Sequence, residues 1–331
     1  MLRWNRGVFR TDFMFLLLAA LAFAVIPLTG NYYIMHVLIL SFLNAMLASA
    51  LDLLVGYTGS LILGYAAFYA IGAYTSTLLS MRVGLSPWIG VFLGGVTSTL
   101  AGLVLGIPAL RLRGPYLAIS TLGFGVIIYL LLINLDFITR GPLGIPGIPP
   151  LPGIGFIDFS DRTTYYYLML VIFVAAIYLL RLLTSSRYGR VLIAMREDED
   201  AAKAIGINIP LYRISVFAIS TFVAGIAGAF YAHYMRYINP EISALSHSIA
   251  ILSMVLLGGA GTVVGPSIGA FILMFISEVL RPLLEYRLLI YGALIVLVIR
   301  YFPGGIYGYL SRKLILRKLV LEKRIEVRKA L

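Results

Sequence analysis

The chain of 331 residues contains no cysteine and is poor in histidine and in charged residues. Without cysteine it can form no disulfide, no thiolate metal site and no cysteine nucleophile. Its 3 histidines, His36, His233 and His247, lie far apart in the sequence, and no two of them have the i, i+4 spacing of a helical metal site. The sequence therefore indicates no bound metal and no other cofactor on this chain.

A nucleotide-binding loop is also missing. The pattern Gly-x-x-x-x-Gly-Lys-Ser/Thr does not occur, so the chain does not bind ATP in the P-loop manner. Any ATP that drives this protein must be bound by a partner. An intramembrane enzyme would need a partnered nucleophile, and none can be assembled from the sequence. Turnover by the purified chain alone would support that alternative.

Acidic residues are scarce within the apolar runs, where Asp52 and Glu278 are the candidates. Ionisable residues within a membrane are functional candidates by default. Asp52 lies near a predicted membrane end, which favours a solvated or helix-terminal carboxylate. Glu278 lies one turn from Arg281, which favours an interfacial pair. Because an ion-coupled secondary transporter usually needs a deep coupling-ion site, this scarcity argues against that class without excluding it.

What the chain does have is long apolar runs. Hydrophobic residues make up 61% of it and charged residues 12%, against about 25% charged in soluble domains. Runs of roughly 20 apolar residues are long enough to cross a bilayer. The sequence predicts an all-α polytopic membrane protein with about ten hydrophobic segments, and broken helices in the glycine-rich ones remain an alternative. The segments are residues 13–28, 32–55, 61–81, 88–110, 114–133, 165–183, 211–235, 242–257, 263–280 and 288–302.

Basic residues orient these segments. The net charge of +12 collects between spans and at the end of the chain, as the positive-inside rule and attraction to anionic lipid predict, so it indicates no nucleic acid partner. The sequence predicts a multi-pass protein of the cell membrane with both termini in the cytoplasm. Residues 184–210 and a basic tail, residues 311–331, lie on the same side. The proline- and glycine-rich stretch 134–164 has few cations and is predicted to be an ordered or extended outer loop.

Two glycine motifs hint at an internal repeat. Gly56-x-x-Gly59-Ser60 and Gly258-x-x-Gly261-Thr262 each follow one apolar run and precede another. Transporters are often built from repeats with the pathway at the repeat interface. Glycine equally allows helices to pack closely, so a repeat and simple helix packing both remain open.

The longest strongly polar interruption is residues 184–210. Its apolar residues fall near one helical face, Gly206 suits a left-handed helix end, and Pro210 suits the first turn of the next helix. The pattern predicts one short amphipathic helix with a small-residue patch at residues 201–204. Lipid-surface helices favour Lys and Arg. Because an anionic bilayer would repel the four consecutive acids at 197–200, the pattern favours docking to a partner protein.

Three stretches carry a resemblance to a known family. Residues 186–234, which begin SRYGRVLIAMREDEDAAKAIGINIP, resemble the permease subunits of branched-chain amino-acid ABC importers. So do residues 113–125, RGPYLAISTLGFG, and residues 239–273, which contain SIAILSMVLLGGAGTVVGPSIGAFIL. The order and spacing also match over roughly residues 35–305. Urea and short-amide permeases are similar, so they remain an alternative for the substrate.

The resemblance implies a single permease domain, residues 1–331, with residues 184–210 as its cytoplasmic coupling loop. It implies partners as well: a second permease subunit, two cytoplasmic ABC ATPases that carry the ATP, and an extracytoplasmic substrate-binding protein. A coupling helix from Arg196 to Gly206 would enter an ATPase cleft. The coupling residues implied are Arg196, Glu197, Asp198, Glu199, Ala201, Ala202 and Gly206.

One motif departs from the family pattern. The outer loop usually has Thr-Gly-Gly-Pro-Asn-Gly, whereas this chain has Thr139-Arg140-Gly141-Pro142-Leu143-Gly144. An amide is lost and a cation is gained where the loop is expected to meet the binding protein or the mouth of the pathway. The departure bears on substrate identity and on the choice of partner.

Alternating access is the mechanism that the resemblance implies. Closure of the ATPases would pull on the coupling helix and rotate the helices around a shared, mostly apolar pathway. Small and hydroxyl residues are the candidates for its lining, and hydrogen bonding to a neighbouring helix is the competing interpretation of each. The candidates are Thr58, Ser60, Ser120, Thr121 and Thr262.

Overall fold

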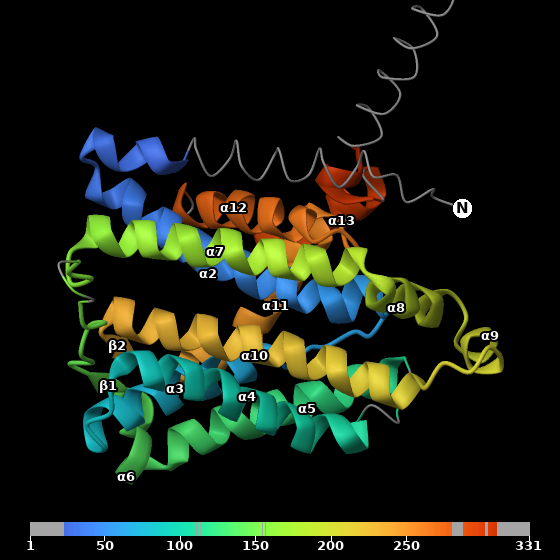
Figure 1. Cartoon of the computed structure of the whole chain (residues 1–331), viewed down its shortest axis with the longest axis horizontal. Coiled ribbons are helices and arrows are strands. Elements are labelled where there is room, and N and C mark those ends of the chain that lie inside the picture. Colours follow the sequence, from blue (N-terminus) through green and yellow to red (C-terminus); the bar gives the residue numbers. More distant parts are fainter. Residues whose placement is uncertain are drawn as a thin grey trace, which may run out of the picture.

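The protein is described here from a computed structural model that covers residues 23–109, 112, 114–153, 155, 157–279, 287–301 and 304–309. Nearly all the described elements are helices, and most lie roughly side by side in one bundle (Figure 1). The long helices are α2 (Tyr32–Asp52), α3 (Ala66–Arg82), α4 (Pro87–Ala109), α5 (Pro115–Asn134), α7 (Arg162–Ser185) and α10 (Ile209–Met235). The shorter ones are α6 (Asp136–Thr139), α8 (Arg187–Glu197), α9 (Glu199–Ala204), α11 (Leu245–Gly258), α12 (Val264–Val279) and α13 (Arg287–Tyr301).

Five helical segments are long and apolar enough to cross a membrane, among the residues described: Tyr32–Tyr57, Pro87–Gly106, Pro115–Asn134, Arg162–Ser185 and Ile209–Met235. Two shorter apolar helices, α11 and α12, join them in the bundle. The predicted all-α polytopic membrane protein is confirmed. Most of the first predicted segment, the cations at its start and the basic tail 311–331 lie outside the described residues.

Broken helices occur where glycine is frequent. Helix α2 ends in a π-helical turn, Leu53–Tyr57, and the chain stays non-helical until α3 begins at Ala66. Helices α11 and α12, of 14 and 16 residues, are separated by a second glycine-containing turn. At a rise of about 1.5 Å per residue, neither reaches the thickness of roughly 30 Å that a spanning helix needs.

Glycine also sets the closest helix contacts in the centre of the bundle. A methyl group at Gly72 of α3 would overlap the backbone of Gly225 in α10, and one at Gly228 would overlap the carbonyl of Tyr69. Buried Ser98 of α4 donates to the carbonyls of Phe68 and Thr221 at 2.9 and 2.8 Å. Small residues thus bring α3, α4 and α10 into backbone contact, as in other membrane bundles.

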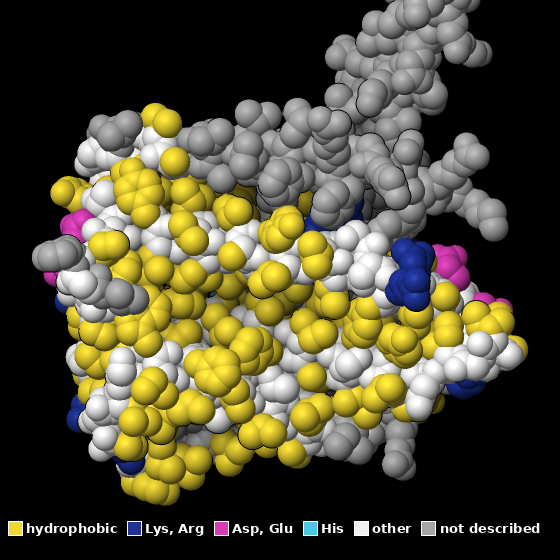
Figure 2. Space-filling model, viewed as in Figure 1, with side chains coloured by type: hydrophobic (Ala, Val, Ile, Leu, Met, Phe, Trp, Pro, Cys, Tyr) yellow, Lys and Arg dark blue, Asp and Glu magenta, His cyan; other side chains and the backbone are white. Residues whose placement is uncertain are grey.

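The two ends of the bundle differ from its sides. Hydrophobic side chains cover much of the lateral face seen in Figure 2, whereas the Lys, Arg, Asp and Glu side chains visible there gather at the two ends. Helices α8 and α9 lie at one end, and α6 with the short strands β1 (Ile145–Pro146) and β2 (Tyr237–Ile238) lies at the other (Figure 1). Residues 134–164 and 184–210 therefore lie on opposite sides of the apolar belt.

The described residues between 134 and 164 include helix α6 and a strand that the sequence did not reveal. Strand β1 pairs antiparallel with β2, and Ile145 lies opposite Ile238. Trp88 Nε1 also donates to the carbonyl of Pro152 at 3.1 Å. In the motif Thr139–Gly144, which differs from the family pattern, Arg140 adopts a left-handed backbone with φ 59°. A non-glycine residue there costs about 1–2 kcal/mol, which explains why glycine suits this position.

Two local expectations need correction, and a third, the pairing of Glu278 with Arg281, stays a prediction. Residues 184–210 form two short helices, α8 and α9, and not one amphipathic helix, because Asp198 adopts an extended backbone between them. Asp52 is a helix-terminal carboxylate, one of the two expected possibilities, because α2 ends at it, but it is not solvated, because it is fully buried. Glu278 accepts a hydrogen bond from the hydroxyl of Tyr33 at the start of α2, and the expected partner Arg281 lies outside the described residues.

Candidate functional site

The first part of the site is the α8–α9 unit, residues 187–204. Ser186 begins it by accepting a hydrogen bond from the backbone of Tyr188 at 3.1 Å. Asp198 ends α8 and starts α9, because its Oδ1 accepts from the backbone of Asp200 and of Ala201, each at 3.0 Å. Capping of free N–H groups by aspartate favours this break over a continuous helix. Gly206, at φ 85°, ends α9 with the left-handed turn that the sequence predicted.

A small core holds the two helices against the start of α10. It consists of buried Met195, Ala202 and Ile209. Beside it, Arg213 of α10 pairs with Glu199 of α9 at 2.9 Å, and the two side chains are only 17% and 18% exposed. Glu199 and Ala202 therefore pack within the unit, although the sequence assigned both to partner contact.

The outer surface of the unit is formed by other residues. Glu197 and Asp200 have side chains that are 69% and 82% exposed, and Ile205 is 75% exposed. Ala201 and Gly206 are exposed beside them. An exposed apolar side chain surrounded by acids and small residues at the tip of the molecule is typical of a protein contact rather than of an anionic lipid surface.

Helix α8 is anchored to the bundle by Tyr188. Its hydroxyl lies 2.7 Å from Ser215 Oγ on α10, and its ring lies beside that of Tyr212. Burial raises the pKa of the Tyr188 hydroxyl, against the opposing effect of the hydrogen bond with Ser215. The phenol therefore remains neutral at physiological pH and available for this hydrogen bond.

The second part of the site is where the glycine motifs meet. We call residues 56–60 the first glycine turn and residues 258–262 the second. Buried Asp52 accepts a hydrogen bond from the backbone of Gly261 at 2.8 Å, and a methyl group at Gly56 would overlap both Asp52 Oδ1 and Gly261 N. Arg196, from the end of α8, donates through Nη1 to the carbonyl of Gly56. Segments about 200 residues apart in sequence are thus joined under the α8–α9 unit.

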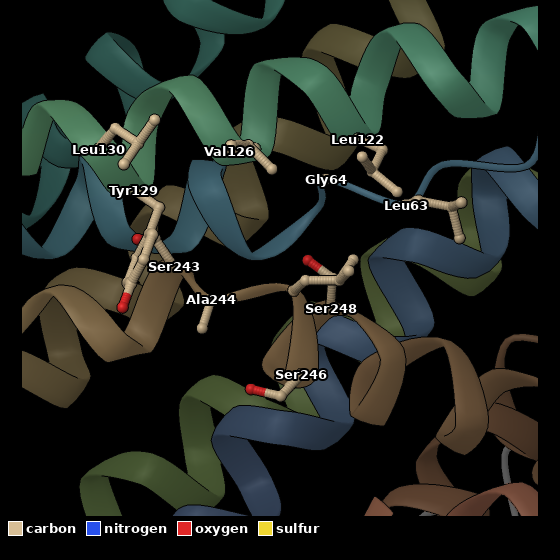
Figure 3. Close-up of a pocket in the computed structure, with 12 residues that line it drawn as sticks. Leu63, Gly64, Leu122, Val126, Tyr129, Leu130, Ser243, Ala244, Ser246 and Ser248 are labelled. Carbon is tan, nitrogen blue, oxygen red and sulfur yellow. The ribbon is translucent and has the colours of Figure 1, made fainter.

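A third feature is a half-open cavity of about 470 Å³ beside the middle turns of α5. Figure 3 shows Leu122, Val126 and Tyr129 projecting from α5 toward residues 63–64 and residues 243–248. Its lining is mainly apolar, with the hydroxyl-bearing residues Tyr129, Ser243, Ser246 and Ser248. A mostly apolar cavity with a few polar groups is the usual form of a small-molecule site.

The five predicted pathway residues do not line this cavity. Thr121 donates to the carbonyl of Ala118 and accepts from the backbone of Leu63, at 2.9 and 3.1 Å. Ser120 donates to Leu117. Thr58 donates to Leu54 and to Ser60, and Thr262 donates to Gly259. The bond from Leu63 to Thr121 satisfies a backbone N–H in the non-helical segment between α2 and α3, where a free N–H group within the membrane region is costly. The assignment of the five residues to the pathway stays a prediction.

The sequence missed the junction of Asp52, Gly56, Gly261 and Arg196. The sequence features that could have indicated this junction are the two glycine motifs and Asp52, the acid before the first motif. The sequence alone does not show that the two motifs are in contact. No cluster of three or more His, Asp and Glu side chains that could hold a metal ion occurs in the described part of the chain.

Comparison with known proteins decides the family. A family model described as "Branched-chain amino acid transport system / permease component" matches residues 33–299. The chain belongs to this family. The resemblance inferred from the motifs is confirmed, and the chain is a transport subunit of the permease type in a multi-pass membrane fold.

Individual relatives agree. The chain is 36% identical over 315 residues to the high-affinity branched-chain amino acid transport system permease protein LivM of Salmonella typhimurium, which covers 88% of this chain and 73% of the relative. It is 37% identical over 289 residues to the LivM protein of Escherichia coli, covering 81% and 68%. A probable LivM permease of Methanocaldococcus jannaschii is 27% identical over 258 residues, covering 70% and 73%. No solved structure matches the chain.

Proposed function

We propose that this chain is the membrane-spanning permease subunit of an ATP-driven importer of branched-chain amino acids. The observation that carries the proposal is the family match over residues 33–299, with LivM relatives similar over most of the chain. Partners of the proposed complex are a second permease subunit, two cytoplasmic ABC ATPases and an extracytoplasmic binding protein. ATP is hydrolysed by the ATPases.

The α8–α9 unit is the proposed ATPase contact, and the side that bears it is the cytoplasm. Its support is the exposed surface of Glu197, Asp200, Ala201, Ile205 and Gly206. Arg196, Asp198, Glu199 and Ala202, assigned to coupling as well, act in this proposal by holding that surface in place. The binding protein is proposed to meet the opposite end, where residues 134–164 lie (Figure 1). Both chain termini belong on the α8–α9 side.

Transport proceeds by alternating access in this proposal, with the cavity beside α5 as part of the pathway. Two properties of the cavity support this. Its apolar lining suits a branched aliphatic side chain, and its hydroxyls can bond the polar groups of an amino acid. It also lies against the non-helical residues 63–64, and irregular backbone occurs at membrane depth only where it is buried or borders a cavity. Five hydroxyl-bearing residues are proposed to support the pathway without lining this cavity: Thr58, Ser60, Ser120, Thr121 and Thr262.

Co-purification in mild detergent tests the ATPase contact. The test variant is Ile205→Asp, and the matched control is Leu143→Asp at the opposite end, because the two side chains are 75% and 82% exposed. We expect the ATPase to purify with the wild type and with Leu143→Asp, but not with Ile205→Asp. The double variant Glu197→Lys with Ala201→Trp should also lose it. Absence of an ATPase from the wild type would contradict the proposed function.

Substrate identity is tested in proteoliposomes that contain the whole complex. Leucine, isoleucine and valine, loaded on the binding protein, should stimulate ATP hydrolysis and enter the vesicles. Stimulation by urea or a short amide alone would assign the chain to the urea and amide permeases instead. Uptake that persists without the ATPase but is abolished by an uncoupler would indicate an ion-coupled transporter.

A further inference from the structure

The side chain of Arg196 reaches from the end of α8 to the two glycine turns. Its guanidinium lies against the backbone of both glycine turns. Nη1 donates to the carbonyl of Gly56, and a Cβ added at Gly261 would lie 3.3 Å from the same Nη1. The stem packs on the first turn as well, where a Cβ at Gly59 would lie 3.1 Å from Arg196 Cγ. Larger residues in either turn would displace the arginine.

Asp52 holds the same two turns from within the bundle. Its carboxyl accepts from Gly261 at 2.8 Å while its own helix carries Gly56. The second oxygen, Oδ2, is also buried, and it has no hydrogen-bond partner among the described residues. The Asp52 carboxyl therefore contacts the two turns from the inner side, and the Arg196 guanidinium contacts them from the outer side.

Each turn is a place where a helix can change direction. The first lies between α2 and α3, and the second lies between α11 and α12. Hinges are a few residues at element ends that absorb backbone changes, often small ones. Helix α11 also connects the two parts of the site: it ends at Gly258, beside the junction, and its first residues, with Ser246 and Ser248, line the cavity.

We propose that Arg196 is a positioning residue for transport, which transmits a displacement of the α8–α9 unit to both glycine turns and through α11 to the cavity. The inference rests on the proposed function, since it takes movement of the unit to come from an ATPase. The sequence assigned Arg196 to the docking surface. In this proposal Arg196 instead links that surface to the pathway. A guanidinium suits this role because its planar fork gives directional hydrogen bonds that an ammonium lacks.

The test compares Arg196→Gln with Arg190→Gln, which changes the charge equally. Arg190 is an exposed arginine on the same helix, and it lies outside the five residues proposed to form the ATPase contact surface. We expect Arg196→Gln to retain the ATPase on co-purification and to hydrolyse ATP with an unchanged KM. Its uptake per ATP should fall about tenfold, the scale expected when a charge-assisted hydrogen bond is lost. Arg190→Gln should transport as the wild type does. Loss of the ATPase from Arg196→Gln, or normal uptake by it, would overturn the inference.

A spectroscopic measurement separates transmission from a merely structural role. Because the chain has no cysteine, Ser246→Cys gives a single label at the cavity. We expect the spectrum of the label to change when nucleotide is added in the wild-type background, and to stay the same in the Arg196→Gln background. The same nucleotide response in both backgrounds would contradict the inference.

Arg196→Lys covers the case in which Arg196→Gln does not accumulate. Lysine keeps the charge but loses the fork, so uptake below that of the wild type is expected, with the ATPase still bound. Full uptake by Arg196→Lys would count against the inference. If no ATPase binds even the wild type, it is the proposed function that fails, and this outcome is distinct from any failure confined to the Arg196 variants.

Discussion

Glu199 of α9 and Arg213 of α10 form an ion pair at 2.9 Å in which both side chains are less than one-fifth exposed. The pair spans the turn that contains Gly206 and fixes how α9 sits on the membrane bundle. Because it is largely shielded from water, it contributes more than an exposed pair does.

Glu199→Gln should therefore loosen α9. We expect the free energy of local unfolding of α9 to fall by about 1–2 kcal/mol, because a charged hydrogen bond within a shielded contact is lost. Hydrogen exchange of the amides at residues 199–205 measures this. Asp200→Asn is the matched control, because Glu199 and Asp200 both pair with Lys203, at 3.4 and 3.7 Å, but Asp200 is 82% exposed. Equal effects of the two changes would show that shielding does not matter here.

Gly56→Ala tests the contact between the glycine turns. A methyl group there overlaps Asp52 Oδ1 and Gly261 N, so the free energy of unfolding should fall by about 1–3 kcal/mol. Gly123→Ala is the control, because a Cβ at Gly123 meets nothing within 4 Å. It should leave stability unchanged or raise it by up to about 1 kcal/mol, owing to the better helix propensity of alanine. Thermal unfolding in detergent distinguishes the two, and a stable Gly56→Ala protein would refute the close approach.

His233 links the outer loop to the bundle. Its Nδ1 lies 2.7 Å from the carbonyl of Pro149, and its Nε2 lies 2.7 Å from Ser76 Oγ. Because a carbonyl only accepts, Nδ1 carries a proton. His233→Phe keeps a ring but removes the partner of the buried Ser76 hydroxyl and of the half-buried Pro149 carbonyl, and a buried polar group left unpaired costs about 1–3 kcal/mol.

We expect His233→Phe to expose residues 147–153 to protease while the ATPase still binds. His36→Phe is the comparison, because Nδ1 of His36, on α2, lies 2.7 Å from the hydroxyl of Tyr234. Protection of the loop unchanged in His233→Phe would show that β1–β2 pairing and the Trp88 hydrogen bond hold it without His233.

Val126→Trp tests the cavity as part of the pathway. Val126 lines the cavity, whereas its neighbour Ile127 on α5 does not and is 56% exposed. A tryptophan at 126 should reduce uptake by the reconstituted complex about tenfold by filling the space, while Ile127→Trp should have little effect. Equal uptake by the two variants would place the pathway elsewhere.

The sequence by itself determined the class of the protein. Long apolar runs with charge confined between them permit only a polytopic membrane fold, because every backbone group in lipid must be bonded within the chain. Local motifs also determined the end of α9 at Gly206 and the start of α10 near Pro210, since these depend on residues adjacent in the chain. Family-specific stretches were sufficient to predict the permease family, which the comparisons confirmed.

Only the tertiary structure decided what the functional residues touch. Asp198 could cap a helix or continue one, and the break was decided when Met195 and Ala202 packed on Ile209. The sequence indicated a solvated or helix-terminal carboxylate at Asp52. Only the structure shows that Gly261 of the second glycine turn, 209 residues later, donates a hydrogen bond to it. Arg196 looked like part of an acidic docking surface until its guanidinium was found on Gly56. Such contacts depend on how separate helices pack, and the periodicity of each segment carries no information about its neighbours in space.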